Sequence, residues 1–468
     1  MGTAPSPSLS HENRYYPGMS CGSPRIVALL LLAAAGCFSD PPPDSQDDST
    51  SGTDTPSTTA PTGVDPTSTS SATMTSPTSG MTSTTNDSNS ASTDDTGADS
   101  SSGGGTRFCG EPAPLLSFSF AQSYDVGGTV ANLYTTNLFG DEGTHIVAAN
   151  RIEPRVDLLS NNRLLGMFSI AYSIEVPEEI SVGVGDLNNN GVDDLVIADR
   201  GTIETYLFDG EQFTEGGPIA TVDDSVWAVA IADFGGSAFG DVAVQTNGEP
   251  ASVEVYPGTG TNIETSPTVF PGGRRTTAMI PAFIDGDERI DLVVARTDAD
   301  HEVSTDAFTV MLNRGNGEGI DFEVANVQTE STPWGMGIVD LNGDASEDIV
   351  IASQGDAPND GIDDTIQIFF NDGNGDFAPQ PPIVVADTLG QIAVGDLDCD
   401  GFDDVAVVSI PGVYVLRGNG AGLEAPELVI EPDGLPLGIV VGYFNADDRL
   451  DIAIGTADTG EVQLFIAD

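Results

Sequence analysis

The chain has 468 residues, and 73 acidic against 14 basic residues give it a formal net charge of −59. This charge argues against nucleic acid as a partner, because nucleic-acid binding relies on basic side chains that displace counterions from phosphate. All 14 basic residues are arginines, which excludes lysine Schiff-base chemistry, and only three histidines occur, so a bound metal must be held by oxygen. The 55 glycines and 30 prolines favour many short strands joined by turns.

The first distinctive segment is an apolar run over residues 26–35, IVALLLLAAA, which follows Arg25 and ends just before the dipeptide that contains Cys37. It is too short to span a bilayer as a mature helix and is typical of a signal-peptide core. The segment LLLLAAAGC resembles a bacterial lipobox, which implies lipidation of Cys37. The alternative is an ordinary signal peptide cleaved nearby, and both interpretations export the protein. We therefore expect a signal-peptide region over residues 1–36, with Met19 as a second candidate start.

A low-complexity segment follows over residues 39–106, built mainly of Ser, Thr, Asp, Pro and Gly without aromatic, leucine, isoleucine or basic residues. Such a segment cannot bury enough apolar area to offset the entropy lost on ordering. We expect residues 37–106 to comprise the lipidated cysteine and a disordered linker. The protein would then be a lipoprotein of the outer membrane or cell surface, or an extracellular protein, that touches the membrane through its lipid anchor only.

The rest of the chain repeats one pattern about every 50 residues, which is the spacing of a repeat architecture. Each unit has an apolar strand, a nine-residue acidic loop and a second apolar strand such as LVIA at 195–198, which suits a strand covered on both faces. The seven loops start at Asn137, Asp186, Asp233, Phe283, Asp340, Asp396 and Tyr443.

Each unit continues with a third strand and a glycine-rich hairpin, as in IFFNDGNGDF at 368–377. Four-stranded sheets that repeat radially predict an all-β fold, a seven-bladed β-propeller of four-stranded antiparallel blades over residues 107–468. The last repeat stops after its third strand at 461–468, and the segment at 114–123 has the pattern of the missing outer strand. We expect these two ends of the chain to complete the seventh blade together.

At this point the repeats resemble the FG-GAP/VCBS family, whose propellers are similar to the heads of integrin α-chains. The resemblance covers residues 108–468, and the literal FG and GAP tripeptides are absent, which favours the VCBS-like branch. It implies a non-enzymatic binding or adhesion module at the cell surface, with a surface protein or a glycan as its ligand. A propeller lectin and a calcium-dependent glycan-active enzyme, either a polysaccharide lyase or a glycosidase, are the alternatives.

The acidic loops have the composition of calcium sites. In the loop at 396–404, carboxylates at positions one, three and five can converge, glycine at position six permits a sharp turn, and position nine closes the cage. Calcium takes six to eight hard oxygen ligands, and the family resemblance implies that the carbonyl at position seven is one of them. An EF-hand is rejected because position twelve, its glutamate, is a strand residue here.

Three loops are complete and two are partial. Affinity is expected to rise with the number of carboxylates, which is two, three and four in the loops at 186, 340 and 396. Ala345 replaces the turn glycine, which costs about 1 kcal/mol if its φ is positive. The complete sets are Asp186, Asn188, Asn190, Val192 and Asp194; Asp340, Asn342, Asp344, Ser346 and Asp348; and Asp396, Asp398, Asp400, Phe402 and Asp404. The weaker sets, with an aromatic residue at position one, are Asp285, Asp287 and Asp291, and Asn445, Asp447 and Asp451.

Other candidates are open to two interpretations each. Cys109 and Cys399 can form a disulfide across the ring seam or remain free thiols. Trp227 and Trp334 lie near the start of an inner strand at the channel mouth, where they stack on a ligand or pack between blades. The long acidic connections at 295–306 and 352–364 are either a ligand surface or solvated loops. No Gly-x-Ser-x-Gly elbow occurs, and we expect no catalytic residues.

Overall fold

In the computed structural model every described residue lies in the unit Pro43–Asp468. The structure describes residues 116–138, 143–150, 155–162, 166–176, 181–199, 201–220, 225–248, 250–273, 276–296, 307–315, 319–354, 364–386 and 388–468. The expected signal peptide, Cys37, the linker and Cys109 lie outside these ranges. Within them, no helix is long and apolar enough to cross a membrane.

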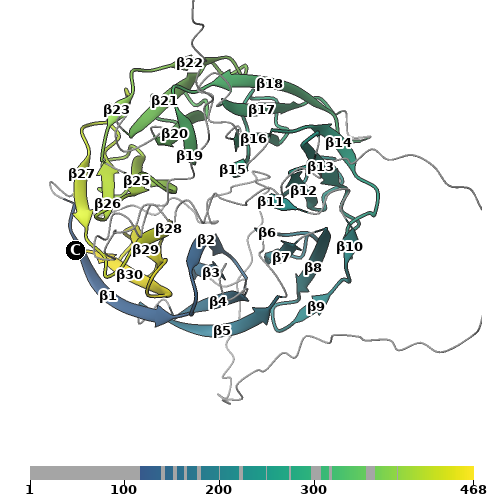
Figure 1. The fold of residues 1–468 in the computed structure, drawn as a ribbon, viewed down its shortest axis with the longest axis horizontal. Helices are drawn as coiled ribbons and strands as arrows, with labels where there is room; N and C mark the ends of the chain where they lie inside the picture. The colour runs from purple at the N-terminus through teal and green to yellow at the C-terminus, as the bar shows by residue number, and fades with distance from the viewer. Residues whose placement is uncertain are drawn as a thin grey trace, which may run out of the picture. The chain divides into compact units, whose positions relative to one another are not determined.

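The described residues form seven antiparallel sheets arranged in a ring, which confirms the seven-bladed propeller (Figure 1). Blade one contains β2 (Val130–Thr136), β3 (His145–Asn150), β4 (Arg155–Asn162) and β5 (Met167–Glu175). Blade two contains β6 (Ser181–Gly185), β7 (Asp194–Asp199), β8 (Thr202–Phe208), β9 (Phe213–Glu215) and β10 (Ile219–Ala220). Blade three contains β11 (Val226–Ala232), β12 (Asp241–Thr246), β13 (Ser252–Tyr256) and β14 (Thr268–Pro271).

The second half of the ring repeats this order. Blade four contains β15 (Thr276–Ala282), β16 (Asp291–Arg296), β17 (Ala307–Asn313) and β18 (Phe322–Gln328). Blade five contains β19 (Thr332–Val339), β20 (Asp348–Gln354), β21 (Thr365–Asn371), β22 (Phe377–Pro379) and β23 (Ile383–Val384). Blade six contains β24 (Ile392–Gly395), β25 (Asp404–Val408), β26 (Val413–Leu416) and β27 (Glu427–Ile430). Blade seven contains β28 (Pro436–Gly442), β29 (Asp451–Thr456), β30 (Glu461–Ala467) and β1 (Phe118–Asp125).

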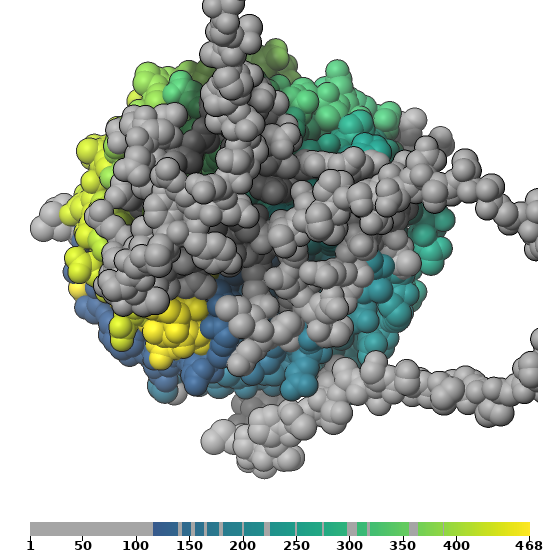
Figure 2. Space-filling model, in the orientation of Figure 1, coloured from purple at the N-terminus to yellow at the C-terminus, as the bar shows by residue number. Residues whose placement is uncertain are grey.

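Blade seven closes the ring as the sequence predicts, because β1 pairs antiparallel with β30. The backbone N–H of Asp468 donates to the carbonyl of Ser117, and the hydroxyls of Ser117 and Ser119 donate to the Asp468 carboxylate at 2.6 and 2.7 Å. In the space-filling view the yellow C-terminal residues lie beside the blue N-terminal strands at the rim (Figure 2). The outer position differs from the prediction in blades two and five, where two short strands, β9 with β10 and β22 with β23, replace one.

The core lies between neighbouring blades. The second strand of each blade is buried on both faces, as its continuous apolar sequence predicts, and in β20 only the last residue is partly exposed. Between blades four and five, for example, Phe308 and Phe369 meet edge to face with ring centroids 4.9 Å apart, packed with Val293 and Ile349. Burial of these aromatic and branched side chains holds each blade to the next.

A β-bulge recurs at the start of five inner strands and reorients one residue in each. Trp227 and Trp334 are the bulged residues of blades three and five, and both are half-buried. At the same place in blade four, the Thr277 hydroxyl donates to the carbonyl of Pro333 in blade five at 3.1 Å. The bulges thus contribute to contact between blades at this end of the inner strands.

Candidate metal-binding loops

One aspartate occupies loop position nine, the first residue of the second strand, in six of the seven blades. It is at most 1% exposed in each blade. One carboxylate oxygen accepts the N–H of loop residue two or three, and the other accepts an N–H at the end of the third strand or two residues beyond it, at 2.6 to 3.1 Å. The six residues are Asp194, Asp241, Asp291, Asp348, Asp404 and Asp451.

This aspartate is therefore part of the blade framework before any metal is considered. Asp241 makes the same two hydrogen bonds in a loop that has lost most candidate ligands. In blade one His145 stands at position nine, and its Nδ1 accepts the N–H of Asn161, near the end of the third strand, at 3.0 Å. The sequence indicated that position nine closes a calcium cage, but its contacts show that it first satisfies buried backbone donors.

Burial makes the ionised form of these aspartates costly. Desolvation raises the pKa of Asp194, Asp291 and Asp348 to about 6, and that of Asp404 and Asp451 to about 7. These pKa values include smaller contributions from the backbone N–H donors, which lower them, and from the negative charges of other loop carboxylates, which raise them. A cation beside such a carboxylate would favour its charged form.

The first loop residue folds the loop back on itself. In blade six, Asp396 accepts the N–H of Asp400 at 3.0 Å and of Gly401 at 3.1 Å, and Asp233 makes equivalent bonds in blade three. Position six has a positive φ in six blades, including 94° at Gly401 and 68° at Ala345. The φ of Ala345 is therefore positive. This left-handed backbone conformation is expected to destabilise the loop by about 1 kcal/mol relative to glycine.

Blade six brings three carboxylates together. Oxygens of Asp396, Asp398 and Asp404 lie within 4.8 Å of one another, and among the described residues no other group of three acidic, histidine or cysteine side chains does so. Asp398 and Asp404 are buried, and desolvation followed by the charge of Asp400 raises the pKa of Asp398. Asp400 is exposed, and its carboxylate accepts the N–H of Phe402. This convergence of two buried carboxylates and one partly buried carboxylate fits a hard divalent cation.

Blades two and five arrange their loops differently. In blade two the Asn188 amide donates to both oxygens of Asp194, at 3.4 and 3.1 Å, so an N–H group faces this carboxylate. The Asn190 amide donates to the carbonyl of Phe208. In blade five, Asp344 is exposed, and the N–H of Ser346 lowers its pKa. The carboxylates of neither loop converge as those of blade six do, and calcium in both remains a prediction.

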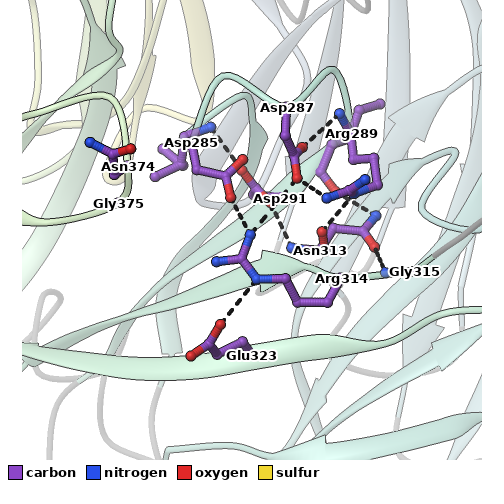
Figure 3. Close-up of polar contacts among 12 residues, drawn as sticks. Asp285, Asp287, Arg289, Asp291, Asn313, Arg314, Gly315, Glu323, Asn374 and Gly375 are labelled. Atoms are coloured by element: carbon purple, nitrogen blue, oxygen red, sulfur yellow. Dashed lines mark hydrogen bonds and ion pairs between the residues drawn. The ribbon is translucent and has the colours of Figure 1, made fainter.

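In blade four, arginines pair with the loop carboxylates (Figure 3). Arg314, directly after β17, forms an ion pair with Asp285, and Arg289 at loop position seven forms one with Asp287. Sequence reasoning missed both arginines. A comparison of the hairpins after the third strands would have shown a signal, because the sequence RGNG occurs at 314–317 in blade four and again at 417–420 in blade six.

The partial loop of blade seven relies on amide and backbone contacts. The Asn445 amide donates to Asp447 at 2.8 Å, and the N–H of Arg449 donates to the same carboxylate at 3.0 Å.

Cys399 in blade six is 7% exposed, has a φ of 64° and is disulfide-bonded. Its predicted partner Cys109 lies outside the described residues, so that pairing remains a prediction.

Comparisons with known proteins agree with the fold. Residues 284–351 and 340–407 each match the FG-GAP-like repeat family. No curated protein matches the chain. Among solved structures, BBS1N in complex with ARL6DN is similar, with a TM-score of 0.51 and 11% identity over 76% of this chain and 98% of that one. An Agrocybe aegerita lectin that recognises non-reducing terminal N-acetylglucosamine has a TM-score of 0.43 and 18% identity over 76% and 92%. At 11% identity the likeness to BBS1N concerns the fold alone.

Proposed function

Because this chain is an FG-GAP-repeat β-propeller protein, we propose that it is an exported, lipid-anchored binding module whose propeller is stabilised by calcium. Propellers with such repeats are typical of non-enzymatic binding modules. The anchor proposal is supported by the apolar segment before Cys37 and by the linker composition over 39–106. A multiply acylated cysteine would hold the protein at a membrane, because each buried methylene contributes about 0.8 kcal/mol.

The observation that carries the calcium proposal is the convergence of Asp396, Asp398 and Asp404 in blade six. Asp400 and the carbonyl of Phe402 are the further candidate ligands of this loop. Calcium would supply positive charge that relieves the repulsion between these carboxylates. Because the ligands converge only in the folded loop, binding free energy becomes folding free energy. The role of the metal would be structural.

The calcium proposal can be tested by thermal unfolding of the full chain in calcium and in a chelator. A site filled at 100 times its dissociation constant would stabilise the fold by about 2.7 kcal/mol. We expect a higher melting temperature in calcium and a much smaller increase in the Asp398→Asn variant. Asp372→Asn, in the exposed hairpin of blade five, is a matched control that should respond to calcium like the wild type. An identical melting temperature in calcium and chelator would contradict the proposal.

The ligand proposal concerns the face opposite the acidic loops. The first-to-second strand loops lie at one end of the blades, and the second-to-third strand connections of antiparallel blades lie at the other. The candidate ligand connections, 295–306 and 352–364, belong to that second set and fall mostly outside the described residues. They would form a binding surface on a rigid ring, which is a common use of loops on a scaffold.

A glycan array and a panel of surface proteins, each probed with and without calcium, would test the binding proposal. Retention of a protein or glycan ligand that is lost in chelator would support a calcium-stabilised binding module, and retention of a glycan would identify a lectin. Conversion of a glycan into products would instead assign the protein to the glycan-active enzymes.

The lipid anchor has its own test. We expect Cys37→Ala to release the protein from the membrane fraction, and unchanged membrane association would contradict the lipid anchor.

A further inference from the structure

The loop of blade four does not offer a metal the ligand set that its sequence suggests. We propose that Arg314 and Arg289 act as built-in cations for this loop, so that blade four is completed without a metal ion. The charge that calcium would bring to blade six is here supplied by two guanidinium groups of the chain itself. The proposal concerns Asp285, Asp287 and Asp291, for which the sequence suggested weak metal binding.

Arg314 neutralises a largely buried loop carboxylate, that of Asp285. The Asp285 side chain is only 7% exposed, and its Oδ2 pairs with Nη1 of Arg314. Its Oδ1 has no hydrogen-bond partner among the described residues, so Arg314 is the group that compensates its charge. The same guanidinium lies 3.8 Å from Asp287 and pairs with Glu323 on β18 at 3.0 Å. Figure 3 shows this guanidinium lying between the loop and β18.

Arg289 neutralises the second carboxylate and connects it to the framework. Its Nη2 pairs with Asp287, and its Nε donates to the carbonyl of Asn313 at 2.8 Å. The Asn313 amide in turn donates to the carbonyl of Ile290 in the same loop and to that of Phe234 in blade three. The arginine thus ties the loop to the end of β17, which itself holds the neighbouring blade.

Loop position one also departs from a metal site. Phe283 replaces the aspartate found at position one in four other loops and offers no side-chain oxygen. Its N–H donates to the Glu347 carboxylate of blade five at 2.7 Å, so the backbone at this position is committed to a contact between blades. Asp291 keeps only its framework bonds to the N–H groups of Ile284 and Asn313. Each residue expected to bind calcium here is therefore replaced by one without a side-chain oxygen, or has at least one carboxylate oxygen already paired within the chain.

A similar arginine contact occurs in blade six, from a different position of the third strand. In blade six, Arg417 lies 3.5 Å from Asp398 and pairs with Glu427 on β27 at 3.3 Å. In both blades an arginine therefore links the aspartate at loop position three to a glutamate on the fourth strand. Phe402, however, stands where blade four has Arg289, and Asp396 stands where it has Phe283. The number of paired arginines therefore separates the two loops.

The first test counts calcium ions bound to the full chain by equilibrium dialysis. This test rests on the proposed calcium function, because it needs a wild-type count above zero. We expect Asp398→Asn to lower the count by one and Asp285→Asn, its counterpart in blade four, to leave it unchanged. A count lowered by one in Asp285→Asn would overturn the built-in cation. A wild-type count of zero would instead contradict the calcium proposal.

The second test does not depend on calcium. In chelator, the urea midpoint is measured for Arg314→Met, Asp285→Asn and the double variant. We expect Arg314→Met to lower the midpoint by leaving a buried carboxylate uncompensated, and the double variant to recover part of the loss. Additive effects of the two changes would overturn the proposal. Arg449→Met is the matched control, because this arginine makes no ion pair with any residue that the structure describes, and its midpoint should equal that of the wild type.

Discussion

The loops of blades four and six share one backbone framework but neutralise their carboxylates in different ways. Asp291 and Asp404 accept the same pair of backbone N–H groups, and both loops have a left-handed residue at position six. In blade four arginines pair with Asp285 and Asp287, whereas in blade six three carboxylates converge. The difference teaches that loop geometry and metal dependence are separable properties of this repeat.

This separation explains why ligand residues alone are a poor guide to metal content. The aspartate at position nine accepts hydrogen bonds from backbone N–H groups, and Asp241 does so in a loop with few other candidate metal ligands. Positions three and five need a positive charge, and in blade four one of its two sources, Arg314, lies outside the loop at the end of the third strand. A loop can therefore contain the aspartates of a calcium site although arginines of the chain, rather than a bound metal ion, neutralise them.

The largest effect on stability is expected at loop position nine, whose aspartate makes equivalent hydrogen bonds in the two blades. In chelator, Asp291→Ala and Asp404→Ala should each reduce the free energy of unfolding by about 2–5 kcal/mol, because two buried N–H groups lose their acceptor. Urea denaturation would measure the loss. Asp400→Ala, in the same loop as Asp404 but exposed, should change stability by no more than about 0.5 kcal/mol. Tolerance of Asp404→Ala alongside a large loss for Asp291→Ala would break the shared framework.

The next effect concerns pH. Since burial raises the pKa of Asp404 and Asp451 to about 7, the folded chain binds more protons than the unfolded chain between about pH 4 and 7. In chelator, the contribution of these two groups to stability should therefore be greatest at or below about pH 4 and be lost as the pH rises to about 7, by roughly 1.4 kcal/mol for each pH unit through which one such group is protonated only in the folded state.

Urea denaturation at pH 5, 6, 7 and 8 would measure this slope. Calcium should flatten it by favouring the charged form of Asp404, and the Asp398→Asn variant should lose that flattening. Asp451→Asn, whose side chain no longer titrates, should show a smaller slope than the wild type in chelator. Stability that rises with pH in chelator would contradict the raised pKa values.

The general architecture could be predicted from sequence because it follows from local patterns. Alternating apolar strands, acidic turns and a third strand without a fourth at 461–468 were sufficient to predict seven blades and the closing strand. Each of these signals lies within one repeat or at the two ends of the repeat array. The split outer strands of blades two and five were missed, because strands of two or three residues are too short to show an alternating pattern in the sequence.

The state of each loop could not be predicted in the same way. Asp285 and Arg314 are 29 positions apart and meet only because β17 ends beside the loop. The partners of Asp241 are backbone N–H groups, which leave no trace in side-chain identity. Sequence therefore indicated which residues carry charge, and the fold determined which charges are already paired.

A smaller effect should follow when the loop of blade four is partly copied into blade six. Phe402→Arg places an arginine at loop position seven, where blade four has Arg289. We expect this guanidinium to compete with calcium for Asp400 and to weaken calcium binding by about 1 kcal/mol, or roughly fivefold. Isothermal titration calorimetry would measure the change. Phe402→Leu is the matched control, and equal affinities of the two variants would show that position seven does not separate the loops.

The smallest effect should come from Arg417, which is poised between two carboxylates. Its guanidinium lies 3.5 Å from Asp398 and 3.3 Å from Glu427, so it competes weakly with calcium for Asp398. Arg417→Met should therefore tighten calcium binding by a few tenths of a kcal/mol, up to about 1 kcal/mol, because the side chain is partly exposed. Glu427→Gln should have the opposite sign, since it leaves Asp398 as the remaining carboxylate partner of Arg417. Affinity changes of the same sign in both variants would show that this arginine does not compete with the metal.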